Sequence, residues 1–188
     1  MWWHERDRGR FRWPRLAAVM ALAGLAGGCF QPLYAQRPID GSPNMQTALA
    51  SVEVAQINAP PASALARMAV DVRNELTYAF TLGNAPAPPR HRLNVSLLTT
   101  GSSLIVDPDT ARAEFELVNA QANYSLVDIA TGKVVMTGSA IAQTTYDVPG
   151  QQQRYTMLAG RQDAQMRAAR VLAEQIRNRL ASYLAAGT

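Results

Sequence analysis

The chain has 188 residues, of which 48% are apolar and 17% are charged, and its formal net charge at pH 7 is +4. An apolar fraction near the globular norm of about 45–50% excludes disorder throughout, and the length suits one domain or at most two. Charged residues fall below the usual share of about 25%, which argues against a polyelectrolyte. The basic residues are nearly all arginines, with Lys133 as the single lysine.

The first 28 residues have the organisation of an export signal. Five arginines and two acidic residues give residues 1–15 a net charge of +3, and Leu16–Ala26 then runs without a charge. Eleven helical residues span about 16 Å, whereas a hydrocarbon core of about 30 Å needs about 20 residues. Residues 1–28 are therefore predicted to be a signal peptide rather than a transmembrane anchor.

Cys29 is the single cysteine, and it follows Gly27-Gly28 directly after the apolar run. An exported protein with one cysteine forms no internal disulfide, so the thiol calls for another role. We expect Cys29 to become the first residue of the mature chain and to carry covalent lipid, which anchors a protein to a membrane without spanning it. The alternative is an ordinary cysteine behind a plain signal peptide.

Removal of residues 1–28 leaves a nearly neutral chain. Thirteen basic and twelve acidic residues remain, so the case for a nucleic-acid partner disappears. The remaining charge is uneven: residues 29–150 carry a net −3 and residues 151–188 carry a net +4.

The mature chain begins with a segment, 29–50, that is predicted to be a lipidated N-terminus and tether because it contains prolines, a glycine and polar residues. Alternating apolar residues predict a first strand within 51–58. Apolar residues at helical spacing then predict a helix that is capped by Ser63 and stops at Gly83. Residues 85–90 are expected to form an extended linker.

A period of two follows and predicts three strands. The first two are expected at 92–100 and 112–127, and the last begins at Val134. Turn-forming residues predict a connection at 101–109 and a hairpin turn at 128–133.

The alternation of apolar residues changes phase at Val118, which predicts a bulge or a change of neighbour there. A long helix is expected over roughly 156–184, with an apolar stripe formed by Ala169, Leu172, Ile176, Leu180 and Tyr183. Arginines lie mainly on its other faces, where they either face solvent or contact a partner or anionic lipid.

The order strand, helix, three strands, helix predicts an α+β fold. We expect a two-layer sandwich, with a mixed or antiparallel sheet of about four strands and both helices on one face. Residues 51–188 are predicted to form this single domain.

Little in the mature chain points to catalysis. It has one histidine, His91, and its one cysteine is expected to be acylated, so Cys–His nucleophiles and zinc sites are disfavoured. No Gly-rich phosphate loop joins a strand to a helix. Glu114 and Glu116 share one face of a predicted strand, where two solvated carboxylates are the expected arrangement. We predict a protein that is not an enzyme and has no cofactor or metal, apart from the covalent lipid.

One charged group follows from the predicted topology. If the strands at 92–100 and 112–127 form an antiparallel hairpin, then Arg90, His91 and Arg92 lie beside the turn that carries Lys133. Arginine and lysine bind phosphate and carboxylate groups. Arg90, Arg92 and Lys133 are therefore a candidate anion site, and the alternative is that these charges simply occupy exposed strand ends.

Three segments of the chain have a recognisable pattern. The expected mature N-terminus reads Cys29-Phe30-Gln31-Pro32-Leu33-Tyr34. The C-terminal half contains Thr145-Tyr146-Asp147-Val148 and then Asp163–Leu184 with its Arg167-Ala168-Ala169-Arg170 and Ile176–Leu180 runs. The first segment resembles the start, and the other two resemble the C-terminal half, of the LPS-assembly lipoprotein family LptE in its alphaproteobacterial form.

The resemblance implies a non-enzymatic protein that plugs the LptD β-barrel, assists its assembly and contacts lipopolysaccharide (LPS). Phe30, rather than Asp, follows the expected lipidated cysteine, which in the general sorting pattern implies the periplasmic side of the outer membrane. On this resemblance, Arg90, Arg92 and Lys133 become the expected LPS contact. The alternatives are another envelope lipoprotein, such as an auxiliary subunit of a lipid-transporting ABC system, and a lipid-anchored hydrolase.

Overall fold

The computed structural model describes residues 44–106, 113–148 and 154–186. These residues all belong to one compact unit of the chain. The signal peptide predicted at 1–28, Cys29, most of the tether and the end of the 101–109 connection lie outside the described residues, and those predictions stay predictions.

The first long helix, α3, spans Ala64–Thr81 and confirms the helix expected between Ser63 and Gly83. Ser63 caps it, because the Ser63 hydroxyl accepts a hydrogen bond from the Ala66 N–H at 3.0 Å. The helix ends at Leu82, which has a left-handed φ of 50°. The apolar residues at helical spacing are Leu65, Met68, Ala69, Val72, Leu76 and Phe80; Leu65 is partly buried and the other five are buried.

Four strands form one sheet in the order β1-β2-β3-β4. β1 (Val52–Val54) runs parallel to β2 (His91–Val106), whereas β3 (Ala113–Asp128) and β4 (Val134–Asp147) extend the sheet in antiparallel fashion. The sheet is therefore mixed, as predicted. β1 is shorter than the strand expected within 51–58.

β2 is longer than the strand predicted at 92–100. The segment Gly101–Ser103 was expected to begin a connection, but it continues the strand, and Gly101 pairs with Val118 of β3. The long β3 supplies backbone partners all the way to Val106, so strand pairing outweighs the local turn chemistry of these small polar residues.

The prediction of a bulge or a change of neighbour at Val118 is wrong, because Val118 pairs with Gly101 and Thr144 in unbroken register. The pairing of β3 with β4 is continuous from Phe115 to Leu126, and the register shifts lie elsewhere, between Ser103 and Val106 and after Leu126. The apolar pattern changes phase for a different reason. The even-numbered residues of β3 from Val118 to Leu126 are buried, and the same face holds the polar Glu116 nearer the strand's start.

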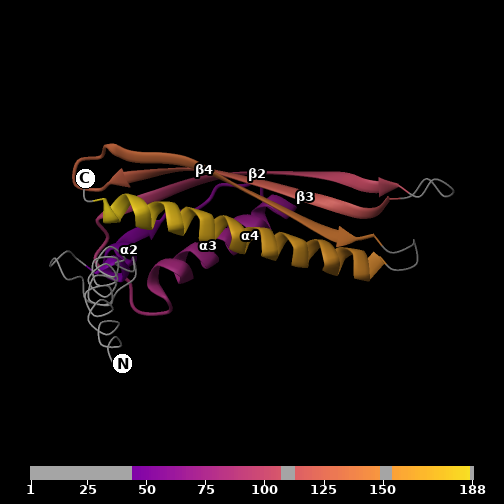
Figure 1. Cartoon of the computed structure of the whole chain (residues 1–188), viewed down its shortest axis with the longest axis horizontal. Helices are drawn as coiled ribbons and strands as arrows, with labels where there is room; N and C mark the ends of the chain where they lie inside the picture. Colours follow the sequence, from indigo (N-terminus) through magenta and orange to yellow (C-terminus); the bar gives the residue numbers. More distant parts are fainter. Residues whose placement is uncertain (1–43, 107–112, 149–153, 187–188) are drawn as a thin grey trace, which may run out of the picture. The chain divides into compact units, whose positions relative to one another are not determined.

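The last helix, α4, spans Arg154–Ala185, close to the predicted 156–184. α3 and α4 pack on one face of the sheet, as expected (Figure 1). Small residues face each other across β3 and β4, because Ala120 pairs with Ala142 and Ala122 with Ala140, which lets α4 approach closely. The apolar stripe of α4 lies in this core, with Ala169, Leu172, Ile176 and Leu180 fully buried and Tyr183 partly buried.

A short helix, α2, occupies Met45–Ala50 and corrects the prediction that all of 29–50 is a tether. Asn44 caps it by accepting a hydrogen bond from the Gln46 N–H at 2.9 Å. Met45 and Leu49 are buried, and the Gln46 side chain donates to the Phe80 carbonyl at 3.1 Å. Six residues are too few to show a helical period, so packing against α3 and α4 decides this element.

Candidate anion site at one end of the sheet

The start of β2 and the turn between β3 and β4 meet at one end of the sheet. His91 pairs with Asp128, and the Ile129 N–H donates to the Arg90 carbonyl at 3.0 Å. The Asp128 N–H donates to the Lys133 carbonyl at 2.9 Å, which closes the turn. The structure thus brings the backbone of Arg90 beside the turn that carries Lys133, in line with the predicted hairpin.

Arg92 lies next to an acidic neighbour that the sequence did not identify. Glu53 of β1 pairs with Arg92 of β2, and Arg92 Nε lies 3.2 Å from Glu53 Oε2. Both side chains are about half exposed, at 52% and 46%, so the ion pair contributes at most about 1 kcal/mol to stability. A guanidinium carries five N–H donors, and the contact to Glu53 uses one of them.

Asp128 adds a second negative charge to this end of the sheet. Its carboxylate accepts hydrogen bonds from the Thr131 N–H at 2.7 Å and from the Thr131 hydroxyl at 2.9 Å. The bonds from Thr131 lower the pKa of Asp128, so the side chain is ionised at neutral pH. Gly132 follows with a φ of 69°, a conformation that suits glycine in this tight turn.

His91 lies apart from the arginines on either side of it. Successive residues of a strand point to opposite faces, so His91 shares the face of the buried Leu93, and Arg92 lies on the other face. Nδ1 of His91 is buried and has no hydrogen-bond partner among the described residues. The structure therefore places Arg90, Arg92 and Lys133 at one end of the sheet but turns His91 towards the helix layer.

Glu116 is not one of two solvated carboxylates. It is partly buried and accepts a short hydrogen bond from the Tyr146 hydroxyl of β4. Burial and this bond to Glu116 raise the pKa of Tyr146 to about 12. The side chain of Glu114 lies outside the described residues, so the expected pair of carboxylates is not seen. The Glu116–Tyr146 contact ties β3 to β4 and is a structural contact.

The arginines of α4 make contacts within the chain. The i,i+4 spacing in the sequence predicts ion pairs of Asp163 with Arg167 and of Arg170 with Glu174. The first is present, with Arg167 Nε 2.8 Å from Asp163 Oδ2. Arg170 Nε instead lies 3.1 Å from Glu75 Oε1 on α3. The packing of the two helices decides this choice, because Glu75 approaches from the facing helix.

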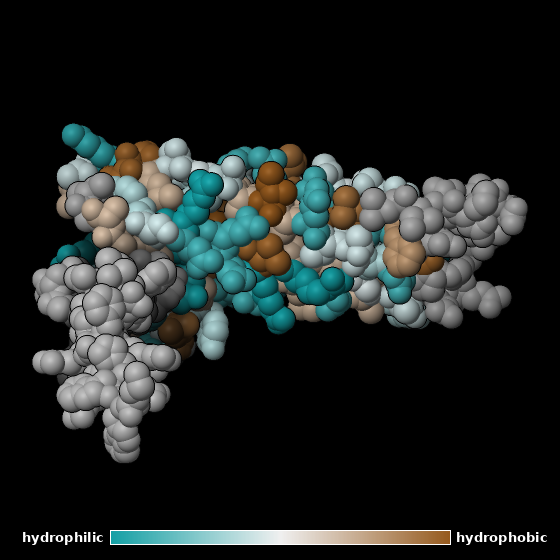
Figure 2. Space-filling model, viewed as in Figure 1, coloured by the Kyte–Doolittle hydropathy of each residue, from teal (hydrophilic) through white to brown (hydrophobic). Residues whose placement is uncertain are grey.

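Shallow grooves lie between α3 and the first half of α4. One of them, with a volume of about 670 Å³, is lined by Val70, Asp71, Gln165 and Met166 among others. Partial burial and the nearby Glu75 raise the pKa of Asp71. Figure 2 shows apolar side chains on the face in view as small groups separated by hydrophilic ones.

The described segments contain no cluster of three or more His, Cys, Asp or Glu side chains that could hold a metal ion. Within the same segments, none of the helices combines the length and apolar character that crossing a membrane requires.

Comparison with known proteins identifies the family. The model of the LptE lipopolysaccharide-assembly family matches residues 49–180, well over half of the chain. The chain belongs to the LptE family. This confirms the resemblance inferred from the sequence, and LptE proteins are envelope-associated lipoproteins of LPS assembly that are not enzymes and are not known to use a cofactor.

Solved structures support the LptE-like fold. A lipoprotein from Caulobacter crescentus is 24% identical, with a TM-score of 0.60 over 77% of this chain and 97% of that one. Lipoprotein B from Nitrosomonas europaea is 12% identical, with a TM-score of 0.51 over 73% of this chain and 90% of that one. No curated protein matches the chain.

Proposed function

We propose that this LptE-family chain is an outer-membrane lipoprotein that plugs an LptD-type β-barrel, assists its assembly and helps to deliver LPS to the outer membrane. Membership of the LptE family is the observation that carries the proposal. The covalent lipid on Cys29 would hold the domain on the periplasmic side of the outer membrane.

The sheet face that points away from the helices supports the role of a plug. Its strands expose many uncharged polar side chains together with the apolar Leu98 and Ile141, and its described charges are Glu53 with Arg92 at one end and Asp147 at the other. The lumen of a membrane β-barrel is largely polar. Hydroxyl and amide groups form hydrogen bonds with such a wall without the cost of desolvating a charge. These groups belong to Asn94, Ser96, Thr100, Ser102, Asn119, Gln121, Asn123, Ser125, Thr137, Ser139, Gln143 and Thr145.

Arg90, Arg92 and Lys133 are the proposed LPS contact. They lie at one end of the sheet, and LPS carries phosphate groups that arginine binds through two N–H donors and lysine as a point charge. Glu53 lies beside Arg92 and partly offsets its charge. A ligand whose phosphates reach all three basic side chains is therefore favoured over a small monovalent anion that contacts Arg92 alone.

Affinity purification from detergent-solubilised outer membrane tests the plug. The lipidated protein is expected to bring down a large β-barrel, whereas a Cys29→Ala variant is expected to lose its membrane attachment. Recovery of inner-membrane transporter subunits alone would support the ABC-system alternative and refute the plug.

Binding of purified LPS tests the basic site. Arg92→Glu with Lys133→Glu is expected to weaken LPS binding about tenfold or more, because two charge-assisted contacts are lost. Arg154→Glu with Arg161→Glu is the matched control, since it changes the net charge equally on the exposed first turns of α4. Circular dichroism checks the fold, and equal binding by both double variants would reject the site.

A further inference from the structure

β4 is an edge strand, and part of its outer edge is already occupied by a side chain of α4. The Ile141 N–H donates to Gln175 Oε1 at 3.3 Å, and Gln175 Nε2 donates to the Ile141 carbonyl at 3.0 Å. A neighbouring strand would make the same two bonds to Ile141. The primary amide of Gln175 therefore takes the place of one residue of an additional strand.

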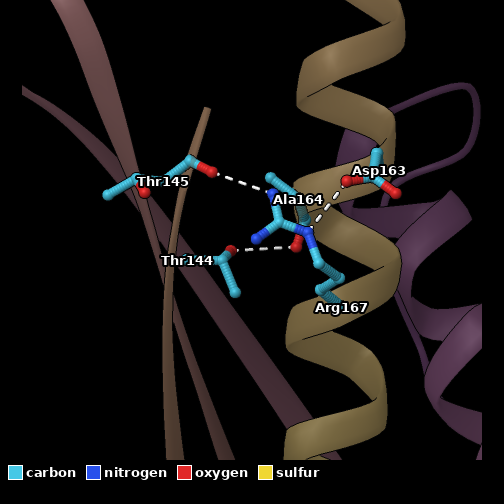
Figure 3. A network of polar contacts seen from close by, with 5 residues as sticks. All are labelled: Thr144, Thr145, Asp163, Ala164 and Arg167. Atoms are coloured by element: carbon cyan, nitrogen blue, oxygen red, sulfur yellow. Dashed lines mark hydrogen bonds and ion pairs between the residues drawn. The ribbon is translucent and has the colours of Figure 1, made fainter. Parts of the chain in front are cut away.

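Arg167 makes a second contact to the same edge. One of its terminal nitrogens donates to the Thr145 carbonyl at 2.9 Å, while its Nε pairs with Asp163 (Figure 3). Beside it, the Thr144 hydroxyl donates to the Ala164 carbonyl at 2.9 Å and holds α4 against β4. Arg167 is thus fixed by its own helix while it caps an outward carbonyl of the strand.

The spacing of the two contacts matches the geometry of a helix lying along a strand. Arg167 and Gln175 are eight residues apart and lie on one face of α4, a rise of about 12 Å. Ile141 and Thr145 are four residues apart, about 13 Å along an extended strand. The two contacts are therefore separated by nearly the same distance along α4 and along β4. We call Gln175 and Arg167 the edge latch.

Without the edge latch, β4 would have few of the features that keep edge strands from pairing. Its 14 residues contain no proline, and Asp147 at the end is the single charged residue. Its register with β3 is unbroken from Met136 to Asp147, so no bulge turns the edge away. Long, flat and uncharged edges pair with other strands.

We propose that the edge latch prevents the β4 edge from pairing with the β4 edge of a second copy of this chain. A second copy is the fitting partner because antiparallel pairing about a two-fold axis presents the same strand twice. The contacts to the outward backbone groups of Ile141 and Thr145 are made by side chains of α4, and the helix backbone meets β4 at Ala164, through the Thr144 hydroxyl on the sheet face. In the monomer, the edge latch thus covers an edge to which another strand could otherwise pair.

The test compares the wild-type chain with Gln175→Ala and with Gln175→Ala combined with Arg167→Ala. Amide hydrogen exchange of Ile141 is expected to rise about tenfold in monomeric Gln175→Ala, the factor expected for loss of one ordinary hydrogen bond. The Ala140 and Ala142 amides face β3 and serve as internal references. The double variant is expected to become a dimer as its concentration approaches the millimolar range, measured by light scattering.

Arg170→Ala is the matched control, because it removes an exposed ion pair of α4 with α3 and leaves β4 untouched. Circular dichroism shows whether each variant retains its fold. Gln175 is exposed, so Gln175→Ala is expected to fold, and exchange at Ile141 can be measured in it even if the double variant unfolds. Unchanged exchange at Ile141 would overturn the latch. A double variant that stays monomeric, or an Arg170→Ala control that dimerises equally, would overturn the assignment of the edge to a second copy.

Discussion

Gly138 of β4 is the position where one added methyl group is expected to have a large effect. A Cβ atom there would lie 2.5 Å from the hydroxyl oxygen of Tyr124 and 2.6 Å from its Cζ. Carbon atoms pack at about 3.5–4.0 Å, so the ring or the strand must shift by about 1 Å. Tyr124 is 4% exposed and belongs to the main core, which leaves the ring little room to move.

The expected change in the free energy of unfolding for Gly138→Ala is the difference between two opposing effects. Forcing extra volume into a packed core costs about 1–3 kcal/mol. Replacing glycine by alanine also restricts the unfolded chain, which stabilises by about 0.4–1 kcal/mol. We therefore expect Gly138→Ala to lower the free energy of unfolding by about 1–2 kcal/mol. For a domain of this size, that shift lowers Tm by about 2–8 °C.

Urea denaturation and thermal unfolding measure this effect, with Gly101→Ala as the matched control. A Cβ at Gly101 would lie 3.8 Å from its nearest neighbour, the Leu117 carbonyl, so this variant is expected to be neutral or slightly stabilised. In a Tyr124→Leu background, Gly138→Ala is expected to cost at least about 1 kcal/mol less than in the wild type. Equal stability of Gly138→Ala and Gly101→Ala would refute the reasoning.

Two further predictions concern charged contacts. Glu53→Gln removes the carboxylate that holds Arg92, and it is expected to strengthen LPS binding about two- to fivefold, in keeping with the value of an exposed ion pair. Weaker LPS binding in a calorimetric titration would contradict the proposed role of Arg92. Tyr146→Phe removes the hydrogen bond to Glu116 and is expected to destabilise the fold at neutral pH by about 1–3 kcal/mol. The pKa of Tyr146 is raised from 10.0 to about 12, so its contribution to stability is complete below pH 10 and is lost as the pH rises towards 12. Urea denaturation at a series of pH values should therefore show a shallower alkaline loss of stability in Tyr146→Phe, and an identical slope would count against this account.

The long elements of the fold follow from the sequence because their patterns extend over many residues. The apolar stripe of α3, with Ser63 as its cap, and the stripe of α4 from Ala169 to Leu180 both predict helices that pack on one sheet face. The hairpin of β2 and β3 follows from two alternating segments and places Arg90 beside the turn at 128–133. These features depend on local periodicity, which a single sequence records.

The features that sequence analysis missed depend on contacts between distant segments. The proximity of Glu53 to Arg92 follows from the parallel register of β1 on β2, which no turn fixes. The pairing of Arg170 with Glu75 depends on how α3 and α4 cross. The extension of β2 beyond Thr100 depends on backbone partners that β3 supplies. In each case the deciding interaction joins residues whose separation in the chain leaves no repeating pattern.

The arginines of α4 and the basic residues at the end of the sheet have different surroundings in the structure. Residues 151–188 carry a net charge of +4, and the sequence left open whether the arginines of the final helix face solvent or contact a partner or anionic lipid. The structure uses Arg167 to cap β4 and Arg170 to join α3, so these two charges are engaged within the chain. At the sheet end that carries Arg90, Arg92 and Lys133, the carboxylate of Glu53 pairs with Arg92, which weakens the attraction of this end for small anions. Binding there is therefore expected to depend on several phosphates held at once, and to weaken as salt concentration rises.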